Sequence, residues 1–179
     1  AYLGGSWKTI LVGTTGAGGR GIFALDVTDP DGFTAAKVLW EIAGISKSDY
    51  PNLGSTIPQP TIVRSHSSRY PWVVIAGNGY YSPNGKAVLL IIDLATGAII
   101  REIDTGAGSN TGENPAGLVS NNGLSTPFVM DYDRDLTAEY VYAGDLAGNL
   151  WKFDLTDSDE SRWKVAYSAN SNPAPLFVA

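Results

Sequence analysis

The segment Phe23-Ala24-Leu25-Asp26-Val27-Thr28 decides the fold class, because its pattern, an apolar strand that ends at an aspartate, occurs three times in the chain. The second copy is Leu90–Ala95 and the third is Trp151–Thr156, which places the aspartates 67 and 61 residues apart. Each copy follows an apolar segment that ends in glycine, namely Gly13, Gly77 and Gly144. Units of short antiparallel strands that repeat at such a period are typical of the four-stranded blades of a β-propeller.

The residues around these copies predict an all-β chain in which helix is confined to short turns. Glycine and proline, 21 and 10 of 179 residues, mark many turns, and a hydrophobic content of 44% is sufficient for one domain with a core. We expect a single partial propeller domain over residues 1–179, with blades at approximately 1–44, 58–104 and 125–168. The first blade is expected to lack its first strand, which leaves about 11 strands in total.

Three blades form only part of a propeller, because closed propellers usually have about four to eight. The chain is therefore expected to be a fragment with open sheet edges that a partner or further sequence covers. The Gly-, Asn- and Ser-rich connection at 104–123 is long for a compact domain, which predicts a functional or mobile loop. The glycine-rich segment 16–21 predicts a hairpin turn rather than a phosphate-binding loop, since no helical pattern follows it.

Charge and composition exclude several classes of function. The net charge is −6 and no basic block occurs, which argues against nucleic-acid binding and against an anionic membrane surface. The absence of cysteine excludes a disulfide framework and a thiolate metal site. The longest apolar run, 87–92, is too short to span a membrane. The single histidine, His66, lies in a serine-rich turn and is expected to be exposed rather than catalytic or metal-binding.

One acidic loop stands out between two predicted strands. Asp131, Asp133, Asp135 and Glu139 occupy positions 1, 3, 5 and 9 of this loop, and Thr137 occupies position 7. Alternate carboxylates in a turn can converge on one point, and position 7 can add a backbone carbonyl. Ca²⁺ takes about six to eight oxygen ligands in such an arrangement, so the loop predicts a calcium site. All of these candidate ligands are oxygens, which favours calcium over a transition metal.

The match to a helix-loop-helix calcium site is incomplete. Leu136 and Tyr142 occupy the places of the glycine and the final glutamate, and the flanking residues predict strands. If the turn requires a positive φ at Leu136, the leucine is strained. The alternative interpretation is a solvated acidic turn. The corresponding turn of the second blade, 64–70, has no acidic residue, so the cluster is not a requirement of the blade itself.

Several segments resemble the C-terminal propeller of the PilY/PilC family of type IV pilus proteins. These segments are Gly18–Pro30, Val38–Glu41, Gly123–Pro127, the acidic loop and Tyr142–Leu155. The resemblance covers nearly the whole chain and implies a quinoprotein-like propeller with one calcium loop of pattern D-x-[DN]-x-D-G-x-x-D. Asp131, Asp133 and Asp135 match this pattern, whereas Leu136 replaces its glycine and Glu139 replaces its last aspartate.

The resemblance also implies a function that is not enzymatic. It implies roles in pilus assembly, adhesion and twitching motility, with calcium governing pilus extension against retraction. It further implies an exported protein of the bacterial outer membrane or cell surface, located at the pilus tip. Its expected partners are pilus tip components such as minor pilins, and a host surface reached through a region outside this chain.

Two other interpretations remain open. The three repeats also resemble the blades of pyrroloquinoline-quinone-dependent dehydrogenases, in which a cofactor lies on the propeller axis and needs a converging cation, Arg, acid and stacking Trp. The tryptophans of this chain are better explained by blade packing. The second alternative is a propeller in which calcium has a purely structural role. Because strands alternate in direction, the acidic loop and the 156–161 loop are expected on one face of the molecule, with the 144–149 turn on the opposite face.

Overall fold

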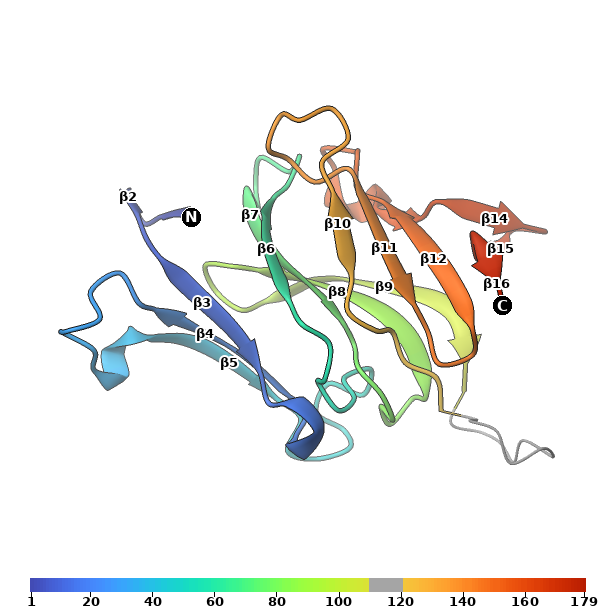
Figure 1. Ribbon diagram of the computed structural model, residues 1–179, viewed down its shortest axis with the longest axis horizontal. Coiled ribbons are helices and arrows are strands. Elements are labelled where there is room, and N and C mark those ends of the chain that lie inside the picture. The colour runs from blue at the N-terminus through green and yellow to red at the C-terminus, as the bar shows by residue number, and fades with distance from the viewer. Residues whose placement is uncertain (110–120) are drawn as a thin grey trace.

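The computed structural model describes residues 1–109 and 121–179, and it places three antiparallel sheets next to one another (Figure 1). Sheet one contains β3 (Ile10–Thr14), β4 (Gly21–Asp26) and β5 (Val38–Ala43). Sheet two contains β6 (Thr61–Arg64), β7 (Trp72–Gly77), β8 (Lys86–Asp93) and β9 (Ile99–Gly108). Sheet three contains β10 (Phe128–Met130), β11 (Tyr140–Gly144), β12 (Asn149–Asp154) and β13 (Lys164–Val165). The predicted all-β partial propeller is confirmed.

Helix is confined to three 3-10 turns of three residues each within the described ranges, as expected. They are η1 (Gly16–Gly18), η2 (Ala35–Lys37) and η3 (Glu160–Arg162). η1 lies in the connection between β3 and β4, so the glycine-rich segment forms a hairpin turn, as predicted. Across residues 1–109 and 121–179, we find no helix with the length and apolar character needed to cross a bilayer.

Sheet two is buried on both faces, which explains the nearly continuous apolar sequence of β7 and β8. Val73 and Ile75 pack against sheet three, whereas Val74 and Ala76 pack against sheet one. All four side chains are at most 1% exposed. Successive residues of a strand point to opposite faces of its sheet, so a strand in a sheet that is packed between two other sheets needs apolar residues at every position.

The repeated glycine of the second unit also reflects this close packing. A Cβ atom on Gly77 would lie 2.1 Å from the backbone oxygen of Ser125, the residue that leads into sheet three. No side chain fits at that distance. Glycine therefore lets the end of β7 approach the next blade.

Sheet one has three strands in the order β3-β4-β5, so the expectation that the first blade lacks its first strand is confirmed. β1 (Tyr2–Leu3) and β2 (Ser6–Trp7) form a short antiparallel pair. Lys8 exchanges backbone hydrogen bonds with Ala1, whereas the carbonyl of the next residue, Thr9, accepts a hydrogen bond from Val27 beyond β4. β1 therefore lies on the side of this segment away from β4, and it belongs to a separate two-stranded sheet.

Sheet three has a fourth strand that is interrupted. β13 pairs with the end of β12, while β16 (Phe177–Val178) pairs with its beginning. Between them the chain forms a separate hairpin of β14 (Tyr167–Ala169) and β15 (Asn172–Ala174). The fourth strand of this blade is therefore divided between β13 and β16. β14 crosses the expected end of this blade at 168, and β15 and β16 lie beyond it. In the second blade, β9 runs past the expected end at 104 to Gly108.

Part of the predicted 104–123 loop belongs to a strand or is buried in the structure. Residues 104–108 belong to β9, and Asn122 to Leu124 are buried; residues 110–120 lie outside the described residues. Asn122 donates its amide to Asp145 over 2.9 Å, and Leu146 donates its N–H to the carbonyl of Gly123 over 3.3 Å. The end of this connection, residues 122–124, therefore lies beside the 144–149 turn.

Asp145 is the centre of this arrangement. Its carboxylate accepts five hydrogen bonds of 2.9 Å, among them those from the Asn122 amide and the Trp151 indole; the others come from the Ala147 N–H and from the N–H and amide of Asn149. Burial raises the pKa of the Asp145 carboxyl, but the hydrogen bonds, with that from the Asn149 side chain the largest, outweigh this effect and hold the pKa below its usual range. The charged form is therefore favoured in the folded state.

Asp145→Asn is expected to lower the free energy of unfolding at pH 7 by roughly 3 kcal/mol, because an amide cannot accept all of these hydrogen bonds. Because the folded-state pKa is lowered, the stabilisation is complete above the unfolded-state pKa of about 4 and is lost as the pH falls through the folded-state pKa. Urea unfolding between pH 7 and pH 3 should show the two proteins converging in acid. Asp31→Asn, an exposed control, should follow the wild type; a difference between Asp145→Asn and wild type that does not change with pH would contradict this assignment.

Candidate metal centre

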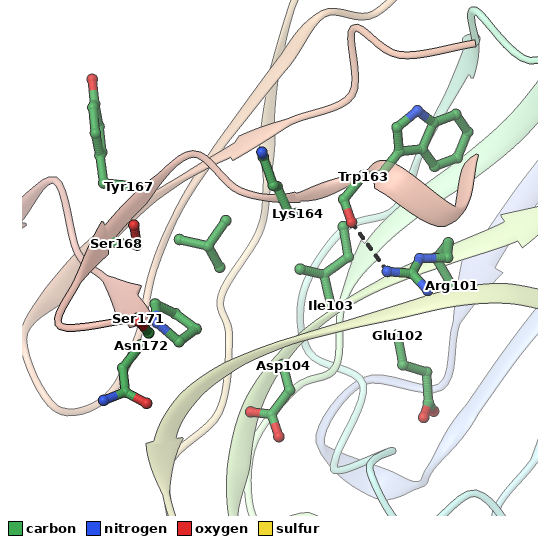
Figure 2. A pocket seen from close by; sticks show the side chains of 12 residues that line it. Arg101, Glu102, Ile103, Asp104, Trp163, Lys164, Tyr167, Ser168, Ser171 and Asn172 are labelled. Atoms are coloured by element: carbon green, nitrogen blue, oxygen red, sulfur yellow. Dashed lines mark hydrogen bonds between the residues drawn. The ribbon is translucent and has the colours of Figure 1, made fainter. Parts of the chain in front are cut away.

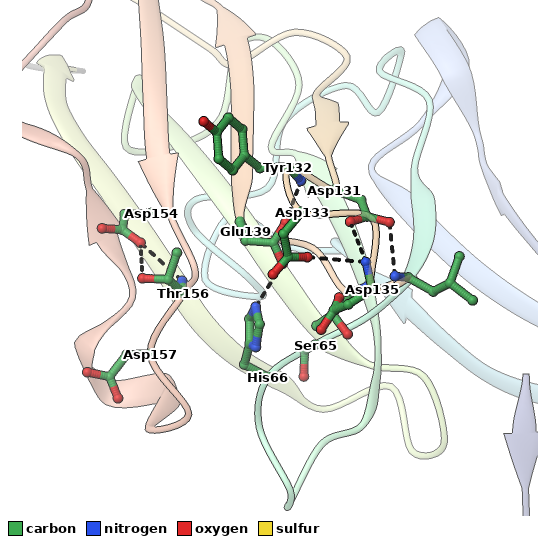
Figure 3. A network of polar contacts seen from close by, with 12 residues as sticks. Ser65, His66, Asp131, Tyr132, Asp133, Asp135, Glu139, Asp154, Thr156 and Asp157 are labelled. Carbon is green, nitrogen blue, oxygen red and sulfur yellow. Dashed lines mark hydrogen bonds and ion pairs between the residues drawn. The ribbon is translucent and has the colours of Figure 1, made fainter.

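The acidic loop, residues 131–139, joins β10 to β11 and is organised by its own aspartates. Asp131 accepts the N–H of Asp135 over 3.1 Å and the N–H of Leu136 over 3.0 Å, through different oxygens. Asp133 also accepts the N–H of Asp135, and Asp135 accepts the N–H of Thr137 over 2.7 Å. These short-range hydrogen bonds fold the loop back on itself, so the alternate side chains turn towards its interior (Figure 3).

The loop brings together the four predicted carboxylates. One oxygen from each of Asp131, Asp133, Asp135 and Glu139 lies within 4.8 Å of the others. Asp133 and Asp135 are exposed, Asp131 is half-buried and Glu139 is buried at the base of the loop. Among the described residues, none of the three aspartates forms an ion pair with a basic side chain. The cluster therefore concentrates negative charge that these residues do not neutralise.

Thr137, the fifth predicted residue, lies at the buried end of the loop. Beyond its hydrogen bond to Asp135, it forms a parallel β-bridge with Arg64 at the end of β6. The next N–H, that of Ala138, donates to the carbonyl of Arg64 over 3.0 Å. Thr137 therefore lies where the loop is joined to sheet two, next to the carboxylate cluster.

His66 is the residue that sequence reasoning missed. Its Nε2 atom lies 2.9 Å from Oε1 of Glu139, and its side chain is only 26% exposed (Figure 3). The expectation of an exposed histidine is therefore wrong. The turn that carries it, 65–70, corresponds to the acidic loop in the preceding blade. Equivalent loops of neighbouring blades open on the same face, and this was the available signal.

The 156–161 loop opens on this face too. Ser67, next to His66, donates its hydroxyl to the carboxylate of Glu160 over 3.1 Å. The 65–70 turn therefore contacts both the acidic loop and the 156–161 loop, and the predicted sharing of one face is confirmed. The side of the propeller that holds the acidic cluster contains loops from two blades.

Leu136 has the strained conformation that the sequence suggested. Its φ is 70°, in the left-handed region where glycine is favoured, and Arg134 in the same loop has a φ of 67°. The Leu136 side chain is 74% exposed, so burial of the side chain offsets little of this strain. The loop therefore tolerates a leucine where its backbone is suited to glycine.

A separate concavity lies on the outer rim, between β9 and the β14–β15 hairpin (Figure 2). Its wall has both charge signs, with Arg101 and Lys164 near Glu102 and Asp104. The guanidinium of Arg101 donates to the carbonyl of Trp163 over 3.1 Å, while its buried Nε atom has no hydrogen-bond partner among the described residues. This mixture of charges does not define a class of ligand.

The tryptophans bear on the dehydrogenase alternative, which requires an accessible stacking ring. Trp40, Trp151 and Trp163 are at most 8% exposed, and each donates its indole N–H to an oxygen of the protein. Their expected role in blade packing is confirmed. Trp7 differs, because it is 71% exposed and contacts Trp72 edge to face with ring centroids 6.3 Å apart.

Comparison with known proteins identifies the family. Residues 1–177 match the family model of the PilY1 β-propeller domain. The chain belongs to this family. The resemblance to PilY/PilC propellers that the sequence motifs suggested is therefore confirmed.

Individual relatives of the PilY1 family agree with this assignment. The chain is 48% identical over its whole length to a type IV pilus biogenesis factor PilY1 homolog of Xylella fastidiosa. It is 47% identical, over 97% of its length, to the type IV pilus biogenesis factor PilY1 of Pseudomonas aeruginosa PAO1. These relatives are named as biogenesis factors and not as enzymes. The chain spans only 12% and 14% of their respective lengths.

A solved structure gives the same answer for the fold. The crystal structure of the Pseudomonas aeruginosa PilY1 C-terminal domain aligns with the whole chain at a TM-score of 0.82 and 40% identity. The chain covers 36% of that structure. The three sheets are therefore similar to part of a larger PilY1 domain.

Replacing the strained leucine tests the loop geometry. Leu136→Gly is expected to raise the free energy of unfolding by up to about 1 kcal/mol, because relief of about 1–2 kcal/mol of left-handed strain exceeds the backbone entropy cost of about 0.5–1 kcal/mol. Leu136→Ala keeps the Cβ atom and should not show this gain, and Leu136→Val should be less stable than the wild type. Urea unfolding with a chelator present measures the effect. If Leu136→Gly is less stable than Leu136→Ala, the backbone of Leu136 is not strained.

Proposed function

We propose that this chain is the calcium-binding propeller region of a type IV pilus biogenesis protein, and that calcium in the acidic loop regulates pilus extension and retraction. The observation that carries the proposal is the convergence of four carboxylates within 4.8 Å in a member of the PilY1 propeller family. The names of the relatives supply the pilus context. The chain itself supplies the donor atoms.

The geometry of the donors suits calcium. Ca²⁺–oxygen distances are about 2.3–2.6 Å, so ligand atoms on opposite sides of one ion lie about 5 Å apart. Four carboxylate oxygens within 4.8 Å of one another are compatible with this sphere. Carboxylates suit a hard cation, whereas zinc and copper sites favour nitrogen or sulfur ligands. The one nearby nitrogen ligand, His66, is directed to Glu139.

The proposed roles of the loop residues follow from their positions. Asp131, Asp133 and Asp135 supply carboxylate oxygens from the tip, and Glu139 supplies one from the base. The backbone carbonyl of Thr137 is the proposed fifth ligand. Water would complete a shell of about six to eight oxygens.

Calcium is proposed to act as a switch because the loop and the core are stabilised by different interactions. The sheets are stabilised by side chains at or near 0% exposure, and the tip aspartates are exposed. Removal of the ion would leave the three aspartates and the buried Glu139 to repel one another while the packed sheets remain. The acidic loop would then change shape without unfolding the blade.

The proposed setting is the bacterial cell surface. We place the protein, after export, at the outer membrane or pilus tip, with minor pilins among its partners and without catalytic activity. Contact with a host surface would require a region outside this chain. A structural calcium site is the second candidate, and exposed aspartates make it the weaker one. The quinone-dependent dehydrogenase is disfavoured by the relatives' names and by the buried tryptophans.

Terbium luminescence tests the metal. Tyr132 lies within the loop and its ring centroid is 6.3 Å from that of Tyr140, so either ring should sensitise a bound Tb³⁺ ion. We expect emission from the wild-type chain that Ca²⁺ displaces, and no such emission from Asp133→Ala. Asp31→Ala, which removes an exposed acid far along the sequence, is the control and should bind like the wild type. Equal binding by Asp133→Ala would show that the cluster is not the site.

Pilus assays separate a switch from a structural ion. Asp131→Ala and Asp135→Ala in the intact protein should keep the β-sheet circular dichroism signal and abolish the calcium dependence of pilus extension and retraction. Thermal stability in calcium should fall only by the linkage term, about 2.7 kcal/mol at calcium 100-fold above Kd. If either variant unfolds outright, the ion is structural and the regulatory proposal is wrong.

A further inference from the structure

The carboxylate of Glu139 is engaged on both of its oxygens. Oε1 lies 2.9 Å from Nε2 of His66, and Oε2 accepts the backbone N–H of Tyr132 over 2.6 Å. The side chain is 7% exposed. A glutamate side chain has three rotatable torsions, and these two contacts together restrict them. One contact comes from the acidic loop itself and the other from the preceding blade.

The turn that presents His66 is itself well defined. The Ser65 hydroxyl donates to the carbonyl of Tyr70, and the hydroxyl oxygen of Ser67 accepts the N–H groups of Arg69 and Tyr70 over 3.2 and 3.3 Å. Ser67 also donates to Glu160. His66 is therefore presented from a closed turn that is fastened to sheet three, and its ring has a fixed position relative to Glu139.

We propose that His66 is a positioning residue of the acidic loop, and that the metal centre is shared between two blades. This inference rests on the proposed calcium site. Because a carboxylate oxygen accepts hydrogen bonds, Nε2 must donate its hydrogen to Glu139. Partners of this kind orient ligating carboxylates, and their loss typically lowers metal affinity by about 10–100-fold.

The backbone reinforces this connection across the blade boundary. Ala138, directly before Glu139, donates its N–H to Arg64, two residues before His66. The N–H of Leu155, directly after β12, donates to the carbonyl of Glu139 over 2.8 Å. Glu139 is thus linked to sheet two by its side chain and to β12 by its backbone. Binding at the loop tip is then coupled to the contact between sheets two and three.

Affinity measurements on the full chain test the role of His66. The affinity for Ca²⁺ is measured by displacement of Tb³⁺. His66→Ala is expected to weaken Ca²⁺ binding by about 10-fold or more. His66→Gln should restore most of the affinity, because its amide offers a donor at a similar reach. Ser68→Ala, an exposed change in the same turn, is the matched control and should bind like the wild type. Rescue by glutamine is not expected if the histidine only fills space.

A spectroscopic measurement covers the case in which His66→Ala does not fold. His66 is the single histidine of the chain, so its imidazole NMR signals are unambiguous. At constant pH these signals should shift on addition of Ca²⁺, with the midpoint of the terbium displacement, and should not shift in Asp133→Ala. If the wild-type chain binds Ca²⁺ but the His66 signals do not shift, the role of His66 is wrong and the calcium proposal stands. The same conclusion follows if His66→Ala binds Ca²⁺ with the affinity of the wild type. A wild-type chain that binds neither Ca²⁺ nor Tb³⁺ overturns the calcium proposal as well.

Discussion

The burial of sheet two between its two neighbours is the constraint on which the rest of the structure depends. Along β8, Leu89 and Ile91 pack towards sheet three while Leu90 and Ile92 pack towards sheet one, and none is more than 1% exposed. Full burial of such a side chain contributes about 1.5–3 kcal/mol. A surface pair such as Arg162–Asp157 contributes about 0–1 kcal/mol. The apolar stack therefore fixes the order of the sheets and the direction of the strands, and so the positions of the loops.

Much of the fold was predictable from the sequence because this packing requires apolar residues at regular positions along each strand. The alternation of Trp151 and Phe153 with Lys152 is typical of a strand with one buried face, and both aromatic residues are at most 2% exposed. The recurring aspartates located the strand ends. The features that were missed do not depend on hydrophobic pattern. The split fourth strand of sheet three depends on which backbone groups of β12 are left for β16. The separate β1–β2 pair has strands of two residues each, which are too short to show an alternation.

The candidate site was predictable to the same extent and for a similar reason. Its four carboxylates come from one short segment, so their spacing alone indicated convergence. His66 comes from 73 residues earlier in the chain, and only the lateral packing of two blades brings it to Glu139. Spacing along a sequence contains no information about such a contact until the loops of adjacent repeats are compared. The sequence predicted strain at Leu136 only if the turn requires a positive φ there, and the structure has this positive φ. The sequence could not decide the point, because a loop backbone is set by its hydrogen bonds as well as by its side chains.

The acidic loop has an exposed tip and a buried base. This division explains how the loop can be held in place at its base and still respond to a cation at its tip. At the base, Thr137, Ala138 and Glu139 are buried and hydrogen-bonded to partners in both sheets or in the loop. At the tip, Asp133 and Asp135 are exposed, and the hydrogen bonds that they accept from the described residues come from backbone N–H groups. A cation would act mainly on the tip, where charge repulsion is greatest, while the base keeps its register with sheet two. Because Glu139 belongs to the base and contributes to the cluster, it is the residue through which a change at the tip can reach the neighbouring blade.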